Sequence, residues 1–206
     1  MTFLKKIFFL FLFGGLSIYC FPQQIVLNEN FDDNINNWPI TQNFGNKSSI
    51  KDGKYRVEIR VGNILLDKLI SLDFNETRNF VIETEITRLA GHAPFGISWG
   101  AKGEGSRFNF VITDSGKYAI NKWDNYMPTP LIKYTYSKYI KPDSAINKLT
   151  IKKIRNKLLF FVNNKYVTQI AFQKFYGHQV GLYSGSGFLI LEIEYLKVYY
   201  PFDEDD

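Results

Sequence analysis

The stretch FVIETEIT, from Phe80 to Thr87, alternates between two kinds of side chain at every residue. One side of the extended chain carries Phe80, Ile82, Thr84 and Ile86, and the other carries Val81, Glu83, Glu85 and Thr87. A period of two is typical of a β-strand that packs one face in a core and turns the other towards water. The same period recurs in 55–61, 107–112, 117–123, 148–154, 157–162, 165–172 and 189–200. The alternation therefore predicts a chain built of half-buried strands.

Turn-forming residues separate these segments at intervals of about ten residues. Asn163-Asn164 joins two alternating runs and predicts a hairpin, because asparagine tolerates a positive φ. No window keeps apolar residues at helical spacing over several turns, and many short strands with evenly spaced turns favour a sandwich. We therefore expect one all-β domain at residues 25–200, a two-sheet antiparallel sandwich of about twelve strands. The longest irregular loop of its second half is expected at Asp124–Pro130, which contains two prolines.

The first twenty residues have the composition of an export signal. Lys5 and Lys6 precede an unbroken apolar run, Ile7 to Phe13, which is too short to span a bilayer. We therefore expect a signal peptide at 1–20 and a protein that is secreted, periplasmic or at the cell surface, without a membrane span. Cys20 is the only cysteine, so no disulfide is expected. The bulky Tyr19 before it fits a lipid-attachment signal poorly.

The charge is mild overall but unevenly spread. It is +5, and it falls to +3 once Lys5 and Lys6 leave with the signal, which does not indicate a nucleic-acid partner. Leu131–Lys174 holds ten lysines and arginines and one acid, Asp143, whereas 201–206 forms an acidic tail. The basic stretch is interpreted either as a solvated lysine-rich face or as a surface that attracts anionic polysaccharide or lipid headgroups.

The segment FDDNINNWP, Phe31 to Pro39, places two aspartates and three asparagines between two aromatic residues. Short polar side chains of this kind turn the backbone locally, so the segment predicts the first corner of the sandwich. A structural Ca²⁺ on Asp32, Asp33 and Asn34 is the alternative. Calcium takes six to eight oxygen ligands, and three neighbouring side chains cannot all face one ion. We therefore expect no cofactor and treat the turn as the leading interpretation.

Several segments together resemble one family. They are LNENFDDNINNWP (27–39), FGISWG (95–100) followed by RFNFVITDSGKYAINKW (107–123), INKLTIKKIRNKLLFFVNNKYV (146–167), HQVGLYSGSG (178–187) and EIEYLKVY (192–199). Their order is similar to that of the concanavalin A-like jelly-roll superfamily, in particular its laminin-G and 3-keto-disaccharide-hydrolase-like domains. The resemblance implies a jelly-roll sandwich. The superfamily includes lectins, glycosidases and structural modules, so the fold leaves the function open.

The sequence offers little for catalysis or metal binding. The resemblance suggests looking for Glu-x-Asp-x-Glu on one strand, as in β-glucanases of the superfamily, and the nearest matches are Glu83-Thr84-Glu85 and Glu192-Ile193-Glu194. Each lacks the third acid, so alternating glutamates on a solvated face explain both. The two histidines, His92 and His178, are far apart and have no cysteine partner, so no metal site is expected. We expect no catalytic residue, although a glycoside hydrolase-like enzyme remains an alternative.

Carbohydrate binding is the leading hypothesis. A sugar needs a flat aromatic surface for its C–H face and amide, acid or arginine groups for its hydroxyls. The expected ligand-binding residues are Trp99, Arg107, Asn109, Trp123, Asp124, Asn125 and Tyr126. Tyr134 and Tyr136 share a strand face with Ile132 and are expected in the core instead. We therefore expect a non-catalytic module for poly- or oligosaccharides; a protein-interaction or envelope-structural module is a further alternative.

Overall fold

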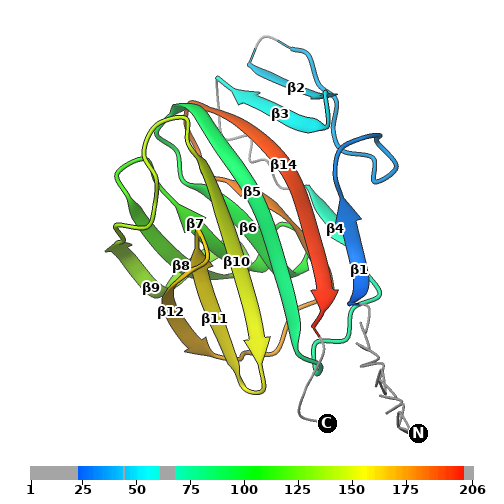
Figure 1. The fold of residues 1–206 in the computed structure, drawn as a ribbon, viewed down its shortest axis with the longest axis vertical. Helices are drawn as coiled ribbons and strands as arrows, with labels where there is room; N and C mark the ends of the chain where they lie inside the picture. The colour runs from blue at the N-terminus through cyan, green and yellow to red at the C-terminus, as the bar shows by residue number, and fades with distance from the viewer. Residues whose placement is uncertain (1–22, 44, 61–67, 202–206) are drawn as a thin grey trace, which may run out of the picture.

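The computed structural model describes residues 23–43, 45–60 and 68–201, and every regular element in these ranges is a β-strand (Figure 1). The strands are β1 (Gln24–Glu29), β2 (Asn46–Lys51), β3 (Lys54–Ile59), β4 (Leu69–Ser71), β5 (Phe80–Gly91), β6 (Phe95–Lys102), β7 (Ser106–Ile112), β8 (Lys117–Asp124), β9 (Met127–Tyr136), β10 (Ile146–Ile154), β11 (Lys157–Val162), β12 (Lys165–Ala171), β13 (Gln179–Ser184) and β14 (Leu189–Tyr200). No helix in the described part of the chain could cross a membrane. The predicted signal peptide, Cys20 and 202–206 of the acidic tail lie outside the described residues.

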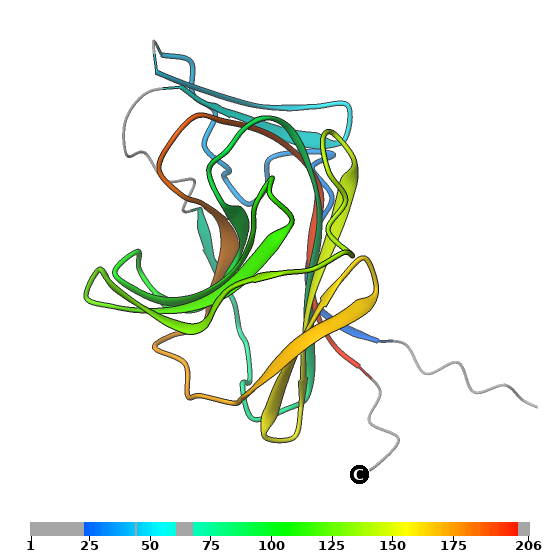
Figure 2. The ribbon, with the colours of Figure 1, turned by 90° about the vertical axis from the view of Figure 1, so that its left-hand side faces the viewer.

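The strands form two antiparallel sheets that lie face to face (Figure 2). The larger sheet has eight strands. Seven of them follow the order β12-β11-β10-β5-β14-β3-β2. The eighth, β1, pairs with Leu196–Tyr200 of β14, on the same edge where β3 pairs with Leu189–Ile193. The smaller sheet has six strands in the order β4-β13-β6-β7-β8-β9. The predicted two-sheet antiparallel sandwich is therefore confirmed, with fourteen described strands where about twelve were expected.

The core face of β5 is the one that the sequence predicts, although Val81 and Thr87 on the other face are also buried. Phe80, Ile82, Thr84 and Ile86 are each at most 1% exposed and face the core between the sheets. Thr84 is the one polar member of this row, and its hydroxyl donates a hydrogen bond to the Tyr195 carbonyl of β14. A buried hydroxyl with a partner does not carry the desolvation cost of an unpaired one. The central strand of the larger sheet therefore carries a continuous core face.

Two expectations for the second half of the chain are wrong. Asp124–Pro130 is not a long loop: Asn125 (φ 47°) and Tyr126 (φ 65°) make a tight turn, and β9 begins at Met127. The two prolines are tolerated because β9 is the edge strand of its sheet and needs no partner on one side. Tyr134 and Tyr136 are 50% and 69% exposed, not buried. The reason is that only Leu131 and Ile132, in the middle of β9, are partly buried. The alternation of apolar residues along the rest of this strand therefore does not mark a face that packs in the core.

The polar segment after β1 is a turn that covers an aromatic corner of the core. Phe31, Trp38 and Tyr55 are at most 1% exposed, and their ring centroids lie 5.2–5.6 Å apart. Asn34 fixes the turn, because its side-chain amide accepts a hydrogen bond from the Trp38 N–H (2.7 Å) and donates one to the Trp38 carbonyl (3.0 Å). Among the described residues, no three His, Cys, Asp or Glu side chains gather as potential metal ligands. The polar side chains thus serve the backbone of the turn.

Beneath this turn lies a buried carboxylate, that of Glu29, which is 2% exposed. One of its oxygens accepts a hydrogen bond from the Phe31 N–H at 2.8 Å. The other accepts from Trp38 Nε1 at 2.6 Å and from the Asn36 amide at 2.7 Å. A buried charged group is tolerated only when its lone pairs are satisfied, as they are here. Glu29 therefore ties the turn to the end of β1.

Because of Tyr55, this corner of the core is expected to lose stability at alkaline pH. Burial raises the pKa of the Tyr55 hydroxyl to about 12, and the hydroxyl donates to the Pro39 carbonyl at 2.9 Å. The unfolded chain loses this proton near pH 10. The stabilisation is therefore complete below about pH 10 and is lost as the pH rises towards 12. Between about pH 10 and about pH 12 the free energy of unfolding should therefore fall by about 2–3 kcal/mol less in Tyr55→Phe than in the wild type. Urea denaturation at several pH values measures this difference. Equal declines in both proteins would contradict this assignment.

Candidate functional site

Five polar and aromatic side chains gather on the outer face of the six-stranded sheet, the face directed away from the core. They are Ser98 of β6, Arg107 and Asn109 of β7, Trp123 of β8 and Tyr183 of β13. We call them the Trp123 cluster. Antiparallel pairing places Arg107 opposite Trp123, and Ser98 opposite Asn109. Their neighbours Phe108 and Phe110 point the other way, into the core. The strand period thus brings together three of the residues that the sequence predicted: Arg107, Asn109 and Trp123.

A hydrogen-bond chain fixes the ring of Trp123. The side-chain amide of Asn109 lies 3.0 Å from Trp123 Nε1 and 2.9 Å from the Ser98 hydroxyl. An indole N–H can only donate, so the amide oxygen must face Trp123 and the amide nitrogen must face Ser98. Asn109 and Ser98 are fully buried. Because the partners of Trp123 are themselves buried, the indole is held in one orientation.

The guanidinium of Arg107 lies between two aromatic rings. It is 5.1 Å from the ring centroid of Trp123 and 5.4 Å from that of Tyr183, within the range of cation–π attraction. It also donates a hydrogen bond to the Glu104 carbonyl. The two rings come from strands three positions apart in the sheet, yet their centroids are 6.4 Å apart. Tyr183 can lean across because the residue opposite it on β6 is Gly96, which has no side chain.

Beside the cluster, the turn between β8 and β9 exposes Asp124, Asn125 and Tyr126. Together with Trp123 we call these residues the rim. The turn is fastened to the β6–β7 loop, because the Tyr126 N–H donates to the Gly105 carbonyl at 2.9 Å. The Tyr126 ring also packs directly on Gly105, where a Cβ would lie 2.9 Å from a ring carbon. Most of the Tyr126 side chain nevertheless faces solvent. The turn therefore offers an acid, an amide and an aromatic ring next to the half-buried Trp123.

The seventh predicted residue, Trp99, is not part of this surface. Its side chain is fully buried on the core face of β6 and lies against Phe108 and Phe160, with ring centroids 5.6 and 5.7 Å apart. The sequence already indicated this position, because Trp99 lies two residues after Ile97 and four after Phe95, on the same face of the strand as these core residues. In the same way, Val180 and Leu182 point into the core, so the alternation along β13 places Tyr183 on the outer face. Tyr183 and Ser98 are the cluster members that sequence reasoning missed.

The acidic pairs considered for catalysis lie on the outer face of the other, eight-stranded sheet. Glu83 pairs with Lys148 at 3.0 Å, and the hydroxyl of Tyr195 is 3.5 Å from the Glu85 carboxylate. Burial, together with these two glutamates, raises the pKa of Tyr195 above its usual range. Each glutamate is thus engaged by a neighbouring side chain.

The second acidic pair is engaged in the same way. Glu192 pairs with Arg56 at 3.0 Å, and Glu194 pairs with Lys54 at 2.7 Å. The hydrogen bond to Glu194 raises the pKa of Lys54, so the lysine stays charged. Of the two histidines, His92 is exposed and pairs with Asp114; this hydrogen bond lowers the pKa of the Asp114 carboxyl. Three of the four glutamates are therefore ion-paired with a neighbouring lysine or arginine, and Glu85 faces the Tyr195 hydroxyl.

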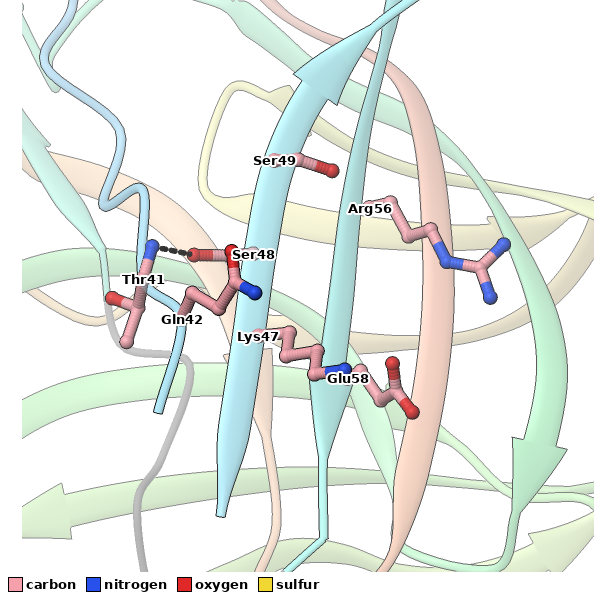
Figure 3. Close-up of a pocket in the computed structure, with 7 residues that line it drawn as sticks. All are labelled: Thr41, Gln42, Lys47, Ser48, Ser49, Arg56 and Glu58. Atoms are coloured by element: carbon pink, nitrogen blue, oxygen red, sulfur yellow. Dashed lines mark hydrogen bonds between the residues drawn. The ribbon is translucent and has the colours of Figure 1, made fainter. Parts of the chain in front are cut away.

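A pocket of about 210 Å³ opens beside β2 and β3 (Figure 3). It is lined by Thr41, Gln42, Lys47, Ser48, Ser49, Arg56 and Glu58. Two of its charges are already paired, Arg56 with Glu192 and Glu58 with Arg60. The Ser48 hydroxyl accepts a hydrogen bond from the Thr41 N–H at 2.9 Å and donates one to the Pro39 carbonyl. None of the described residues that line the pocket is aromatic, and Arg56, Glu58 and Ser48 already have partners within the fold.

No protein-family model matches this chain, and no curated protein sequence is similar to it at a significant level. The fold, in contrast, has clear relatives among solved structures. A carbohydrate-binding module of Bacillus subtilis matches with a TM-score of 0.52 and 11% identity, over 79% of this chain and 92% of that one. A β-glucanase of Bacillus licheniformis matches with a TM-score of 0.55 and 11% identity, over 86% and 98%. An endo-β-galactosidase of Clostridium perfringens gives 0.57 and 12%, over 88% and 64%. The predicted concanavalin A-like jelly roll is confirmed.

Proposed function

We propose that this protein is an exported, non-catalytic module that binds a saccharide at the rim formed by Trp123, Asp124, Asn125 and Tyr126. The similar structures include a carbohydrate-binding module and two glycanases, which supports a saccharide ligand. A shared fold at this level of identity does not assign a function. The proposal therefore depends on the surface itself.

The observation that carries the proposal is the fixed indole of Trp123 beside exposed polar groups. Asn109 holds Trp123 Nε1 at 3.0 Å, and Arg107 lies 5.1 Å from the ring. A ring that is already immobile loses little conformational entropy when a ligand stacks on it. Asp124 and Asn125 are exposed next to it and offer acceptors and donors for sugar hydroxyls. This combination suits a ligand with one apolar face and many hydroxyls.

The non-catalytic part of the proposal is supported by the state of the acidic side chains. Glu83, Glu192 and Glu194 are ion-paired, and Glu85 faces the Tyr195 hydroxyl. A retaining glycosidase needs two carboxylates poised about 5 Å apart across the scissile bond. Hydrolysis of a 3-keto-disaccharide that is lost in Glu83→Gln or Glu85→Gln would favour the enzyme alternative. The export part depends on residues 1–20, and secretion of a reporter fused to them would test it.

Removing the indole is expected to weaken saccharide binding at least about tenfold, because stacked aromatic anchors commonly account for about 1.4 kcal/mol or more. A glycan array identifies the ligand, and titration calorimetry then compares wild type with Trp123→Ala. Tyr126→Ala is the second variant, since its side chain is mostly exposed and its loss leaves the core intact. We expect about a fivefold loss there.

Tyr134→Ala is the matched control, because Tyr134 is also an exposed tyrosine but lies outside the rim, in the second half of β9. Its affinity should equal that of the wild type, and thermal melts should show that all three variants are folded. A silent glycan array, or wild-type affinity in both rim variants, would contradict the proposal. Co-purification of a protein partner with a silent array would favour the interaction-module alternative.

A further inference from the structure

A groove of about 300 Å³ lies at the seam between the two sheets, where β9 ends and β12 begins. It is lined by Tyr118, Tyr136, Ser137, Lys138, Tyr139, Tyr166 and Val167. Figure 2 views the molecule from the side on which the edge strands β9 and β12 lie. The Tyr118 hydroxyl of β8 donates to the Val167 carbonyl of β12 at 3.1 Å and joins the two sheets here. The groove is thus built from both sheets and is separate from the Trp123 rim.

Three tyrosines present ring surface to this groove. Tyr136 is largely exposed, and Tyr166 and Tyr139 are 50% and 36% exposed. Aromatic rings left in solvent over such a groove mark a binding surface more often than isolated exposed residues do. The sequence had assigned Tyr136 to the core, so this surface became visible only in the structure.

Each tyrosine is held in place by a neighbour. The Tyr136 ring packs against Gly116, where a Cβ would lie 3.3 Å from a ring carbon. The Tyr166 ring meets Phe161 edge-on at 5.9 Å. The Tyr139 carbonyl accepts a hydrogen bond from the Asn163 side chain at 2.7 Å, which anchors that part of the loop. The rings of Tyr136 and Tyr166, and the backbone at Tyr139, are therefore arranged before any ligand arrives.

The charge of the surrounding chain is positive. Lys138 lines the groove, with its ammonium 5.5 Å from the ring centroid of Tyr139. Lys117 of β8 is the residue directly opposite Tyr136 in the β8–β9 pairing, and Lys165 directly precedes Tyr166 in the sequence. Six of the seven lining residues belong to Leu131–Lys174, a stretch in which ten basic residues accompany one acid. A groove with a positive surround raises the local concentration of anionic ligands.

We propose that this groove is a second binding site, and that it takes a segment of an acidic polysaccharide. The tyrosine rings would lie against the apolar faces of the sugar rings, and Lys138 would pair with a carboxylate or sulfate group. A lipid surface fits less well, because the exposed side chains are tyrosines and lysines, and the feature is a groove between strand edges. The inference is independent of the Trp123 rim, because it uses other residues and another part of the sandwich.

The test uses affinity electrophoresis and calorimetry of the full chain with three probes. Oligogalacturonate carries carboxylates, dextran sulfate carries sulfates, and plain dextran carries no charge. We expect one or both acidic probes to bind and plain dextran not to bind; the acidic probe that binds more tightly identifies the anionic group. Raising the salt from about 50 mM to about 500 mM should weaken binding severalfold, because exposed charges are screened.

Tyr136→Ala and Lys138→Ala should each weaken acidic-probe binding about tenfold, and Lys138→Arg should retain it. The matched controls are Tyr134→Ala, an exposed tyrosine outside the groove, and Lys51→Ala, an exposed lysine at the end of β2. Both controls should bind the acidic probes as the wild type does. Loss of acidic-probe binding in Trp123→Ala would assign that binding to the rim, which distinguishes failure of this site from failure of the rim.

Four further outcomes would overturn the inference. They are the absence of binding to both acidic probes, equally tight binding of plain dextran by the Trp123→Ala variant, equal losses in the control variants, and wild-type affinity in both groove variants. Binding of the wild type to phosphatidylglycerol vesicles, lost in the same two variants and without acidic-probe binding, would assign the groove to a membrane surface instead.

Discussion

Glu29→Ala is expected to lower the free energy of unfolding by about 3 kcal/mol or more. The substitution removes a buried carboxylate that accepts three hydrogen bonds, from the Phe31 N–H, Trp38 Nε1 and the Asn36 amide. A buried donor left without an acceptor costs about 1–3 kcal/mol, and Phe31 and Trp38 are themselves buried. For a domain of this size, such a loss corresponds to a fall in melting temperature of about 10 °C.

Urea denaturation of the wild type and two further variants tests the source of this effect. Glu29→Gln keeps the shape but turns an NH₂ group towards donors, so it should cost about 2 kcal/mol. Asp33→Ala is the control, because that exposed carboxylate accepts one hydrogen bond, from the Ile35 N–H at 3.0 Å. It should cost no more than about 1 kcal/mol. If Glu29→Ala were no more destabilising than Asp33→Ala, the buried network would not stabilise the corner.

Gly91→Ala is expected to destabilise the protein by about 4 kcal/mol or more. Gly91 ends β5 and pairs with Leu189 of β14, and its φ of 91° is one that side chains rarely adopt. A Cβ at this position would lie 2.0 Å from the Phe188 carbonyl oxygen and 2.6 Å from Leu189 Cα. Both are backbone atoms, and the carbonyl also accepts a hydrogen bond from the His92 N–H at 3.2 Å. The overlap therefore has to push two central strands apart.

Gly103→Ala separates the steric overlap from backbone strain. Gly103 also has a positive φ, 69°, but a Cβ there would meet nothing within 4 Å. Its substitution should therefore show only the conformational cost, about 1–2 kcal/mol. Thermal and urea unfolding of both variants gives the difference. Equal losses in the two variants would mean that the β5–β14 contact can relax around a methyl group.

Local pattern was sufficient for the features that depend on neighbouring residues. The core face of β5 follows from its period of two, and the β11–β12 hairpin follows from Asn163 and Asn164, whose φ angles are 51° and 62°. The corner at Phe31–Pro39 followed from side chains that bond their own backbone. Arg107 and Asn109 were found because they alternate with the core residues Phe108 and Phe110, and Trp123 was found because an aromatic ring, an acid and an amide follow one another at the end of a strand.

Features that depend on distant segments could not be predicted in this way. β9 shows apolar residues at strand spacing, but its position at the edge of a sheet leaves Tyr134 and Tyr136 in solvent. Edge position is a property of the sheet order, which the sequence of one strand does not contain. The groove between β9 and β12 has the same origin, since its walls come from both sheets. Tyr183 differs, because its parity was readable and was overlooked.

The place of β14 in the larger sheet has a consequence for how the chain folds during synthesis. β5 lies along one edge of β14, while β3 pairs with Leu189–Ile193 and β1 with Leu196–Tyr200 on the other. The ribosome delivers these three strands long before it delivers the strand that joins them. A nascent chain therefore carries unpaired strand edges until β14 emerges, and such edges are prone to aggregation. Productive folding must wait until β14 has emerged, so holdase chaperones should bind nascent chains mainly before that strand appears.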